Sequence, residues 1–151
     1  MGDLHVIGID LGGSHVSAAV VDPSGAVVAQ VDVSIDRTRP THDLVTEDIA
    51  GAVRSAIAAA GLTMSRVRAV GMGLPGNIHR ASGVCRFSPN FDWHDVPVGP
   101  LLEQALGAPV QLLNDVRSHT LGEWHFGAGR GLGSFAMFLS LIHISEPTRP
   151  E

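Results

Sequence analysis

Hydrophobic residues gather in three short runs along the first third of the chain, and each run predicts a β-strand. An apolar run from residue 6 ends at Asp10, residues 15–22 (HVSAAVVD) alternate with the two-residue period of a strand, and residues 26–34 (AVVAQVDVS) form the third run. In the second run, Val16, Ala18 and Val20 fall on one face, whereas a histidine, a serine and an alanine fall on the other. The turn sequences Gly-Gly-Ser and Asp-Pro-Ser-Gly separate the three runs. The pattern predicts a three-stranded antiparallel meander whose first hairpin has its tip at residues 10–14.

The period then changes to that of a helix. Apolar residues recur every fourth position from Val45 to Ile57, which predicts a helix capped by Thr41 and ended by Gly61. The later segments alternate in type: a strand over 67–76 that ends in a Gly/Pro loop, an irregular segment over 77–96, a short helix over 98–107, a strand over 109–113, a helix from 114 to 127, and a strand beginning at 134. A meander followed by alternating helices and strands predicts an α/β layer fold with a mixed sheet.

Composition restricts the class of protein. The chain has 151 residues, 44% hydrophobic and 17% charged, which is typical of one globular domain. Its net charge of −5 argues against a nucleic-acid partner, and no apolar run is long enough to span a membrane. The single cysteine, Cys85, cannot form an internal disulfide and is expected to be a small buried or loop residue. We therefore expect a cytoplasmic protein without nucleic-acid or membrane partners.

The glycine-rich hairpin is the first candidate site. All ten basic residues are arginine, so the lysine that a Walker A loop or a protein-kinase fold requires is absent from this chain. Adjacent Gly12 and Gly13 let successive backbone N–H groups converge on an anion, and Ser14 adds a hydroxyl. A plain hairpin turn is the alternative. Asp10 favours a site, because a carboxylate at the end of a buried strand is costly unless it holds water or Mg²⁺.

The second candidate site is the pair Asn114 and Asp115, at the junction of a strand and a helix. Polar groups converge at such junctions in open α/β sheets. One interpretation is helix capping, because Asn and Asp are preferred caps. The other is a carboxylate that accepts a hydroxyl proton during phosphoryl transfer.

Four motifs in order resemble those of the ROK family of sugar kinases and sugar-responsive repressors, which belongs to the actin-like (ribonuclease H-like) ATPase superfamily. They are GIDLGGSH (8–15), GMGLPG (71–76), SPNFDW (88–93) and NDVRSHTLGEWHFGAGRG (114–131). The resemblance runs from about Val6 to Phe138. It implies that residues 1–138 are the N-terminal lobe of a ROK-type sugar kinase.

The resemblance also implies roles for individual residues. The hairpin, with Asp10, Gly12, Gly13, Ser14 and His15, would bind the phosphates of ATP, and Asp10 would support Mg²⁺ through a water. Asp115 would be the general base that takes the proton of a hexose 6-hydroxyl, and Asn114 would orient the sugar. The sugar pocket would be lined by Gly76, Asn77 and Asn90.

The implied activity of the whole protein is ATP-dependent phosphorylation of a hexose by a homodimer or homotetramer. The sugar, and ATP as against polyphosphate as donor, stay open. A sugar-responsive repressor without its DNA-binding head is the alternative, and we rank it second because the hairpin strand begins too close to Met1 for a helix-turn-helix domain. Asp10 and Asp115 disfavour a third interpretation, a purely structural module.

The last thirteen residues differ in kind from the rest. Residues 139–151 (LSLIHISEPTRPE) resemble translated read-through of a sequencing-library adapter, and we expect them to be an artefactual tail. The expected lobe is therefore truncated, without the second phosphate loop and the zinc motif of the family. We expect it to be inactive alone and to hold no zinc site.

Several other residues attract structural interpretations. His119 and His125 lack the spacing of metal ligands. Glu123 is expected to be structural, Trp93 and Trp124 to belong to the core, and residues 127–133 to form a turn.

Overall fold

The computed structural model describes residues 4–138. The expected artefactual tail, residues 139–151, lies outside the described residues. The chain divides into two compact units, Met1–His119 and Thr120–Glu151. Within residues 4–138, no helix is both long and apolar enough to cross a membrane.

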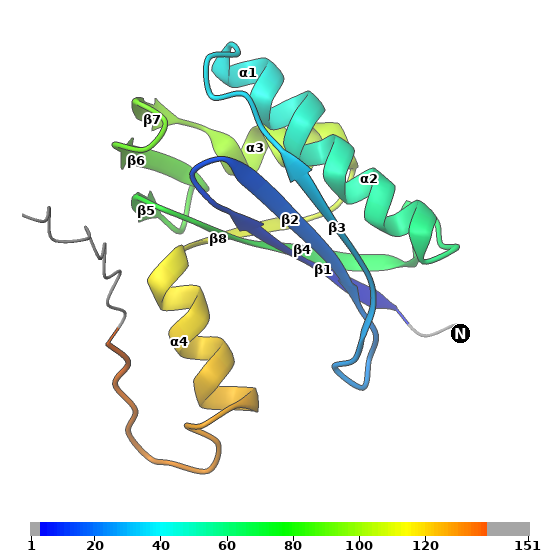
Figure 1. Ribbon diagram of the computed structural model, residues 1–151, viewed down its shortest axis with the longest axis vertical. Helices are drawn as coiled ribbons and strands as arrows, with labels where there is room; N and C mark the ends of the chain where they lie inside the picture. The colour runs from blue at the N-terminus through cyan, green and yellow to red at the C-terminus, as the bar shows by residue number, and fades with distance from the viewer. Residues whose placement is uncertain (1–3, 139–151) are drawn as a thin grey trace, which may run out of the picture. The chain divides into compact units, whose positions relative to one another are not determined.

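The first unit is built on a five-stranded mixed sheet of order β3-β2-β1-β4-β8 (Figure 1). Its strands are β1 (His5–Leu11), β2 (His15–Val21), β3 (Val27–Ser34), β4 (Val67–Leu74) and β8 (Val110–Asn114). β1, β2 and β3 pair antiparallel, whereas β1, β4 and β8 run parallel. The predicted meander and mixed sheet are confirmed, and the carboxyl ends of three parallel strands meet at one edge.

Helices cover one face of this sheet. α1 (Thr41–Asp43), a π-helical segment η1 (Leu44–Ile49) and α2 (Ala50–Ala59) form one continuous rod, and α2 packs on β2 and β3. After a 3₁₀ turn, η2 (Met64–Arg66), and β4, helix α3 (Val98–Leu106) packs on β8.

The π-helical segment agrees with the spacing of the apolar residues. Val45, Ile49, Val53 and Ile57 are all buried although they recur every fourth residue. A regular helix has 3.6 residues per turn, so a strict four-residue repeat drifts around its surface. A wider π turn, which closes i→i+5 hydrogen bonds, counteracts that drift. The sequence prediction covered this helix but not its wider segment.

The sequence predicted the end of this helical rod correctly but not its cap. Thr41 is the first helical residue and not the cap; Pro40 precedes it, and no side chain caps this end. The Pro40 carbonyl accepts the Leu44 N–H at 3.0 Å, so the first helical bond starts one residue earlier than expected. Gly61 has φ of +66°, and the Leu62 N–H donates to the Ile57 carbonyl at 3.0 Å. This Schellman motif confirms the predicted end.

The expectation of an irregular segment over 77–96 is wrong. These residues form a second, three-stranded antiparallel sheet of β5 (Asn77–His79), β6 (Val84–Ser88) and β7 (Trp93–Val96). The strands are only three to five residues long, and Asp92 and Asp95 between and within them have positive φ. Such short runs are too brief for alternation to reveal them.

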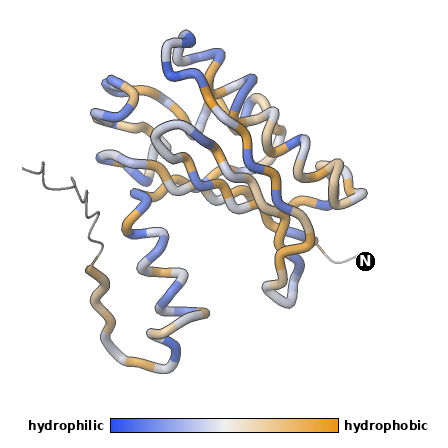
Figure 2. Tube along the Cα trace, in the orientation of Figure 1, coloured by the Kyte–Doolittle hydropathy of each residue, from blue (hydrophilic) through white to orange (hydrophobic). Residues whose placement is uncertain are grey.

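The core lies between the helices and the covered face of the large sheet. Figure 2 shows hydrophobic residues gathered along the central strands and polar residues at the loop tips. Trp93, 2% exposed, stacks on Phe91 with ring centroids 4.7 Å apart, which confirms its place in the core. Cys85 is buried as expected.

Helix α4 (Asp115–Phe126) begins in the first unit and ends in the second. In the second unit Trp124 is 37% exposed and its Nε1–H donates to the Leu132 carbonyl at 2.9 Å, so the prediction of a core position is wrong. Residues 127–131 turn as expected, but residues 134–138 form no strand. A strand needs a hydrogen-bonded neighbour, and the described part of this unit contains no other strand.

Candidate active site

The glycine hairpin lies between β1 and β2. It is closed by the Gly12 N–H, which donates to the His15 carbonyl at 2.9 Å, and its tip is Gly13 and Ser14. The Ser14 hydroxyl contacts His15 Nδ1 at 2.8 Å. Within residues 4–138 the N–H groups of Gly13 and Ser14 have no hydrogen-bond partner.

The fold itself does not require glycine at this tip. Neither Gly12 nor Gly13 has a positive φ, and a Cβ on Gly13 would meet nothing within 4 Å. The missing side chains therefore leave the free N–H groups of the tip open to a ligand, as an anion site requires.

Asp10 is exposed and is the penultimate residue of β1. The expectation of a buried carboxylate at this point is wrong. Successive residues of a strand face opposite sides, and the buried residues Ile9 and Leu11 turn Asp10 to the face that α2 and α3 do not cover. In the sheet Asp10 pairs with Ser17 on β2 and with Gly73 on β4.

Gly73 lies beside both residues that carry the candidate carboxylates, Asp10 and Asp115. A Cβ on Gly73 would lie 3.1 Å from Ser118 Oγ, 3.3 Å from Ser118 Cβ and 3.7 Å from Asp115 Cα. The first turns of α4 thus pack directly on the backbone of β4, which is possible because this position has no side chain. Since Asp10 is the register partner of Gly73, Asp10 and Asp115 both adjoin the same residue.

Asn114 and Asp115 cap helix α4, as one interpretation of the sequence proposed. The Arg117 N–H donates to Asn114 Oδ1 at 3.3 Å, and the Val116 N–H donates to Asp115 Oδ1 at 2.8 Å. Asn114 also reaches across to the Gly/Pro loop, where its Nδ2 donates to the Gly76 carbonyl at 3.2 Å. The Asn114 side chain therefore both caps α4 and contacts the Gly/Pro loop.

Three of the residues expected to bind sugar meet in one pocket. The pocket has a volume of about 170 Å³ and contains Gly76, Asn77 and Asn114. Its other lining residues are Ile78, Arg80, Leu113 and Arg117. Asp115 follows Asn114 but does not line the pocket. The two arginines were not identified from the sequence, where proximity of Arg117 to Asp115 was the available signal.

Asn90 lies in a different hollow, of about 500 Å³. That hollow is lined by Ser14, Ile35, Asp36, Arg37, Thr38, Pro89, Asn90, Phe91 and Asp92. Arg37 Nη1 donates to the Asn90 carbonyl at 3.1 Å and so links the β3–α1 loop to the β6–β7 turn. The structure therefore places Asn90 beside Ser14 of the glycine hairpin and apart from Gly76 and Asn77.

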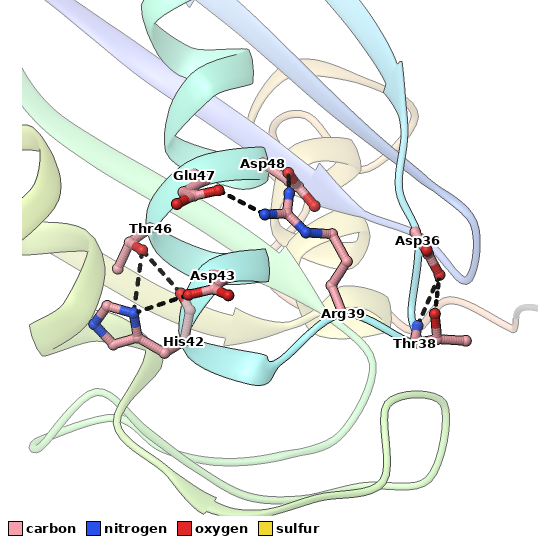
Figure 3. A network of polar contacts seen from close by, with 8 residues as sticks. All are labelled: Asp36, Thr38, Arg39, His42, Asp43, Thr46, Glu47 and Asp48. Atoms are coloured by element: carbon pink, nitrogen blue, oxygen red, sulfur yellow. Dashed lines mark hydrogen bonds and ion pairs between the residues drawn. The ribbon is translucent and has the colours of Figure 1, made fainter.

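The β3–α1 loop that lines this hollow is held by a polar network (Figure 3). Arg39 forms ion pairs with Glu47 and Asp48 on η1. The Asp36 carboxylate accepts hydrogen bonds from the Thr38 hydroxyl at 2.7 Å and the Thr38 N–H at 2.9 Å, which lower the pKa of Asp36. These contacts fix the loop opposite Ser14.

The donor set of the site suits a weakly held Mg²⁺. Residues 4–138 contain no group of three or more His, Cys, Asp or Glu side chains that could hold a metal. Mg²⁺ keeps several waters and is bound by one or two carboxylates together with substrate phosphates. The exposed Asp10 beside the hairpin tip fits that arrangement.

Several known proteins are similar in sequence to this chain. The glucokinase of Thermotoga maritima is 40% identical over 135 residues, covering 87% of this chain and 40% of that protein. The chain thus spans about 40% of the length of this relative. A putative xylose repressor from Caldicellulosiruptor is 29% identical over 136 residues, covering 90% of this chain and 34% of the repressor.

Solved structures agree. A ROK hexokinase from Thermus thermophilus superposes with a TM-score of 0.74 at 36% identity, covering 85% of this chain and 41% of that one. A ROK family glucokinase from Streptomyces griseus, in complex with glucose and AMPPNP, superposes with a TM-score of 0.68 at 35% identity, covering 84% and 38%. The fold is that of the actin-like ATPases, as expected. The ROK family profile matches residues 6–140, and the chain therefore belongs to the ROK family.

Proposed function

We propose that this chain is the N-terminal lobe of an ATP-dependent kinase that phosphorylates the 6-hydroxyl of a hexose. The observation that carries the proposal is the position of Asp10 and Asp115 on two sides of Gly73. Phosphoryl transfer needs a phosphate cradle and a base within one site, and catalysis consists mainly of positioning and charge stabilisation. Similarity to glucokinases supports the same conclusion.

In this proposal the hairpin binds the phosphates of ATP through the N–H groups of Gly13 and Ser14. His15 and the Ser14 hydroxyl complete the cradle. Asp10 would hold Mg²⁺ through a water, and the bound ion would supply positive charge that offsets the negative phosphate oxygens. No lysine is available in this chain for that purpose.

Asp115 acts as general base. It accepts the proton of the 6-hydroxyl while the sugar oxygen forms a bond to the γ-phosphorus and the bond from that phosphorus to the β,γ-bridging oxygen breaks, which releases ADP. Asn114, with Gly76 and Asn77, orients the sugar in the pocket of about 170 Å³. Asn90 holds the side of the site nearest the hairpin.

A chimera tests the proposal. Residues 6–138 would replace the matched segment of the Thermotoga maritima glucokinase, and ADP formation would be measured with ATP or polyphosphate and a panel of hexoses. We expect turnover that depends on both ATP and a hexose, and none from the 151-residue chain alone. A folded chimera that binds hexose but makes no ADP would contradict the kinase assignment.

A sugar-responsive repressor is the second candidate. The similarity to a putative xylose repressor supports it. A repressor needs sugar affinity without turnover, so the chimera separates the two functions: a sensor lobe would bind hexose with or without Asp115 and release no ADP. Turnover that is lost in Asp115→Asn would reject the repressor.

A further inference from the structure

Two arginines without partners line the pocket beside Asn114. Within residues 4–138, the guanidinium groups of Arg80 and Arg117 make neither an ion pair nor a hydrogen bond. Most other arginines of this part of the chain are engaged: Arg39 and Arg86 pair with carboxylates, for example, and Arg54 donates to a carbonyl. The unpaired charge of Arg80 and Arg117 is therefore concentrated in one small hollow.

The other polar groups of this pocket are amides, not acids. No carboxylate lines it. The Asn77 side chain has no hydrogen-bond partner within residues 4–138, and the Asn114 amide keeps one N–H after its bond to Gly76. Arg117 also lies in the first turn of the twelve-residue helix α4, where the helix dipole favours negative charge.

Two guanidinium groups and no acid select an anion. The planar guanidinium matches the oxygens of a phosphate in a bidentate geometry, whereas the amides of Asn77 and Asn114 suit hydroxyl groups. The volume of about 170 Å³ is below that of typical sites for drug-sized ligands, so the ligand is small. The chain as a whole carries −5, so general attraction would not bring an anion here.

We propose that this pocket binds a hexose phosphate, with the phosphate monoester on Arg80 and Arg117 and the sugar hydroxyls on Asn77 and Asn114. The inference rests on the proposed function for the identity of the sugar, because it makes the ligand the product of that reaction. The phosphate monoester of the product carries the negative charge that the two guanidinium groups attract. The two arginines therefore bind the product more tightly than the neutral sugar.

The test is titration of the 151-residue chain with glucose 6-phosphate, glucose and inorganic phosphate by calorimetry. We expect glucose 6-phosphate to bind more tightly than either other probe. Arg117→Gln and Arg80→Gln should each weaken it by about tenfold, the effect of losing one charge-assisted hydrogen bond. Arg117→Lys should weaken it less, because the charge stays. Binding should also fall as salt rises, since both side chains are exposed.

Arg68→Gln is the matched control. Arg68 is an exposed arginine on β4 that makes no ion pair or side-chain hydrogen bond within residues 4–138, and it lies outside the pocket. Its loss should leave the affinity for glucose 6-phosphate unchanged, and circular dichroism melting should confirm that all variants are folded. Equal losses in Arg68→Gln and Arg117→Gln, no binding by the folded wild type, or inorganic phosphate binding as tightly as glucose 6-phosphate would each overturn the proposal.

The result is separable from the kinase assignment. If the arginines bind glucose 6-phosphate and the chimera makes no ADP, the pocket stands and the kinase function fails. If the chimera phosphorylates glucose while Arg80→Gln and Arg117→Gln keep full affinity for glucose 6-phosphate, the pocket assignment alone is rejected.

Discussion

Replacement of Asp115 by Asn changes the proposed base without removing its hydrogen-bond acceptor. In the wild type, Asp115 Oδ1 accepts the Val116 N–H at 2.8 Å, and this is its hydrogen bond within residues 4–138. The amide oxygen of Asn can accept the same bond in nearly the same geometry. The substitution therefore removes a negative charge and the ability to accept a proton, and little else.

The cost in stability follows from these contacts. A negative charge in the first turn of an exposed helix contributes about 0.3–1 kcal/mol through the helix dipole. Because the N–H bond is kept, Asp115→Asn should lower the free energy of unfolding by less than about 1 kcal/mol. In a domain of this size the melting temperature would fall by roughly 2–6 °C.

The effect on turnover should be much larger. Loss of general-base catalysis lowers rates by about 10²–10⁴-fold, which corresponds to roughly 3–5 kcal/mol of activation free energy. Sugar affinity should persist, because Asn114, Gly76 and Asn77 are unchanged. Turnover should thus fall by a factor that the change in stability cannot explain.

The assay compares melting temperature, hexose affinity and ADP formation for wild type and Asp115→Asn in the chimera. Asp43→Asn, at a half-buried position of α1 outside both pockets, controls for the loss of one negative charge. If Asp115 only caps α4, turnover will stay within a few-fold of wild type and stability alone will change. That outcome would refute the assignment of Asp115 as the base.

Three further predictions concern the 151-residue chain itself. Gly76→Ala should lower the free energy of unfolding in urea by about 2–4 kcal/mol, because a Cβ there would lie 2.5 Å from a carbonyl oxygen of β6 and φ is +145°. The control Gly51→Ala lies in open space on α2 and should instead raise that free energy by about 0.5–1 kcal/mol. Hydrogen bonds, first that with the Ser24 hydroxyl, lower the pKa of Asp22 below its ordinary 3.8. The ionised carboxylate therefore stabilises the fold above that pH, and its contribution is lost as pH falls through the folded-state pKa. Asp22→Asn should flatten the acid limb of a stability–pH profile, and an unchanged limb would contradict this. Burial raises the pKa of the Cys85 thiol, so iodoacetamide should label it only when urea unfolds the chain, and rapid labelling of the folded chain would show that the thiol is accessible.

The sequence alone predicted the elements whose patterns are long and regular. The meander, β4, α3, β8 and the start of α4 lie where periodicity placed them, because several turns or alternations repeat the same signal. It failed on β5, β6 and β7, whose strands are too short to repeat a pattern, and on residues 134–138, where no neighbouring strand is described to pair with them.

Glycine positions also predicted correctly where two helices end. Gly61 and Gly107 end their helices with positive φ, as expected of glycine after a last helical turn. Thr41 did not cap, since the backbone carbonyl of Pro40 already begins the helix. Local rules thus identified where a helix ends more exactly than which atom starts it.

The candidate site was predicted in its parts but not in its arrangement. Motifs identified Asp10, Asn114 and Asp115 one by one, because each lies next to a local signal. Only the tertiary structure decided that Asp10 is exposed, that Asp10 and Asp115 both adjoin Gly73, and that Asn90 lies in a separate hollow.

The same holds for Arg80 and Arg117, which are far apart in the sequence and share one pocket. Their meeting depends on the parallel pairing of β4 with β8, because β5 and Arg80 follow β4 whereas α4 and Arg117 follow β8. A local pattern records which face of its own strand a side chain occupies. It carries no information about the neighbouring strand. The pairing between strands therefore decided that the side chains of Arg80 and Arg117 line the same pocket.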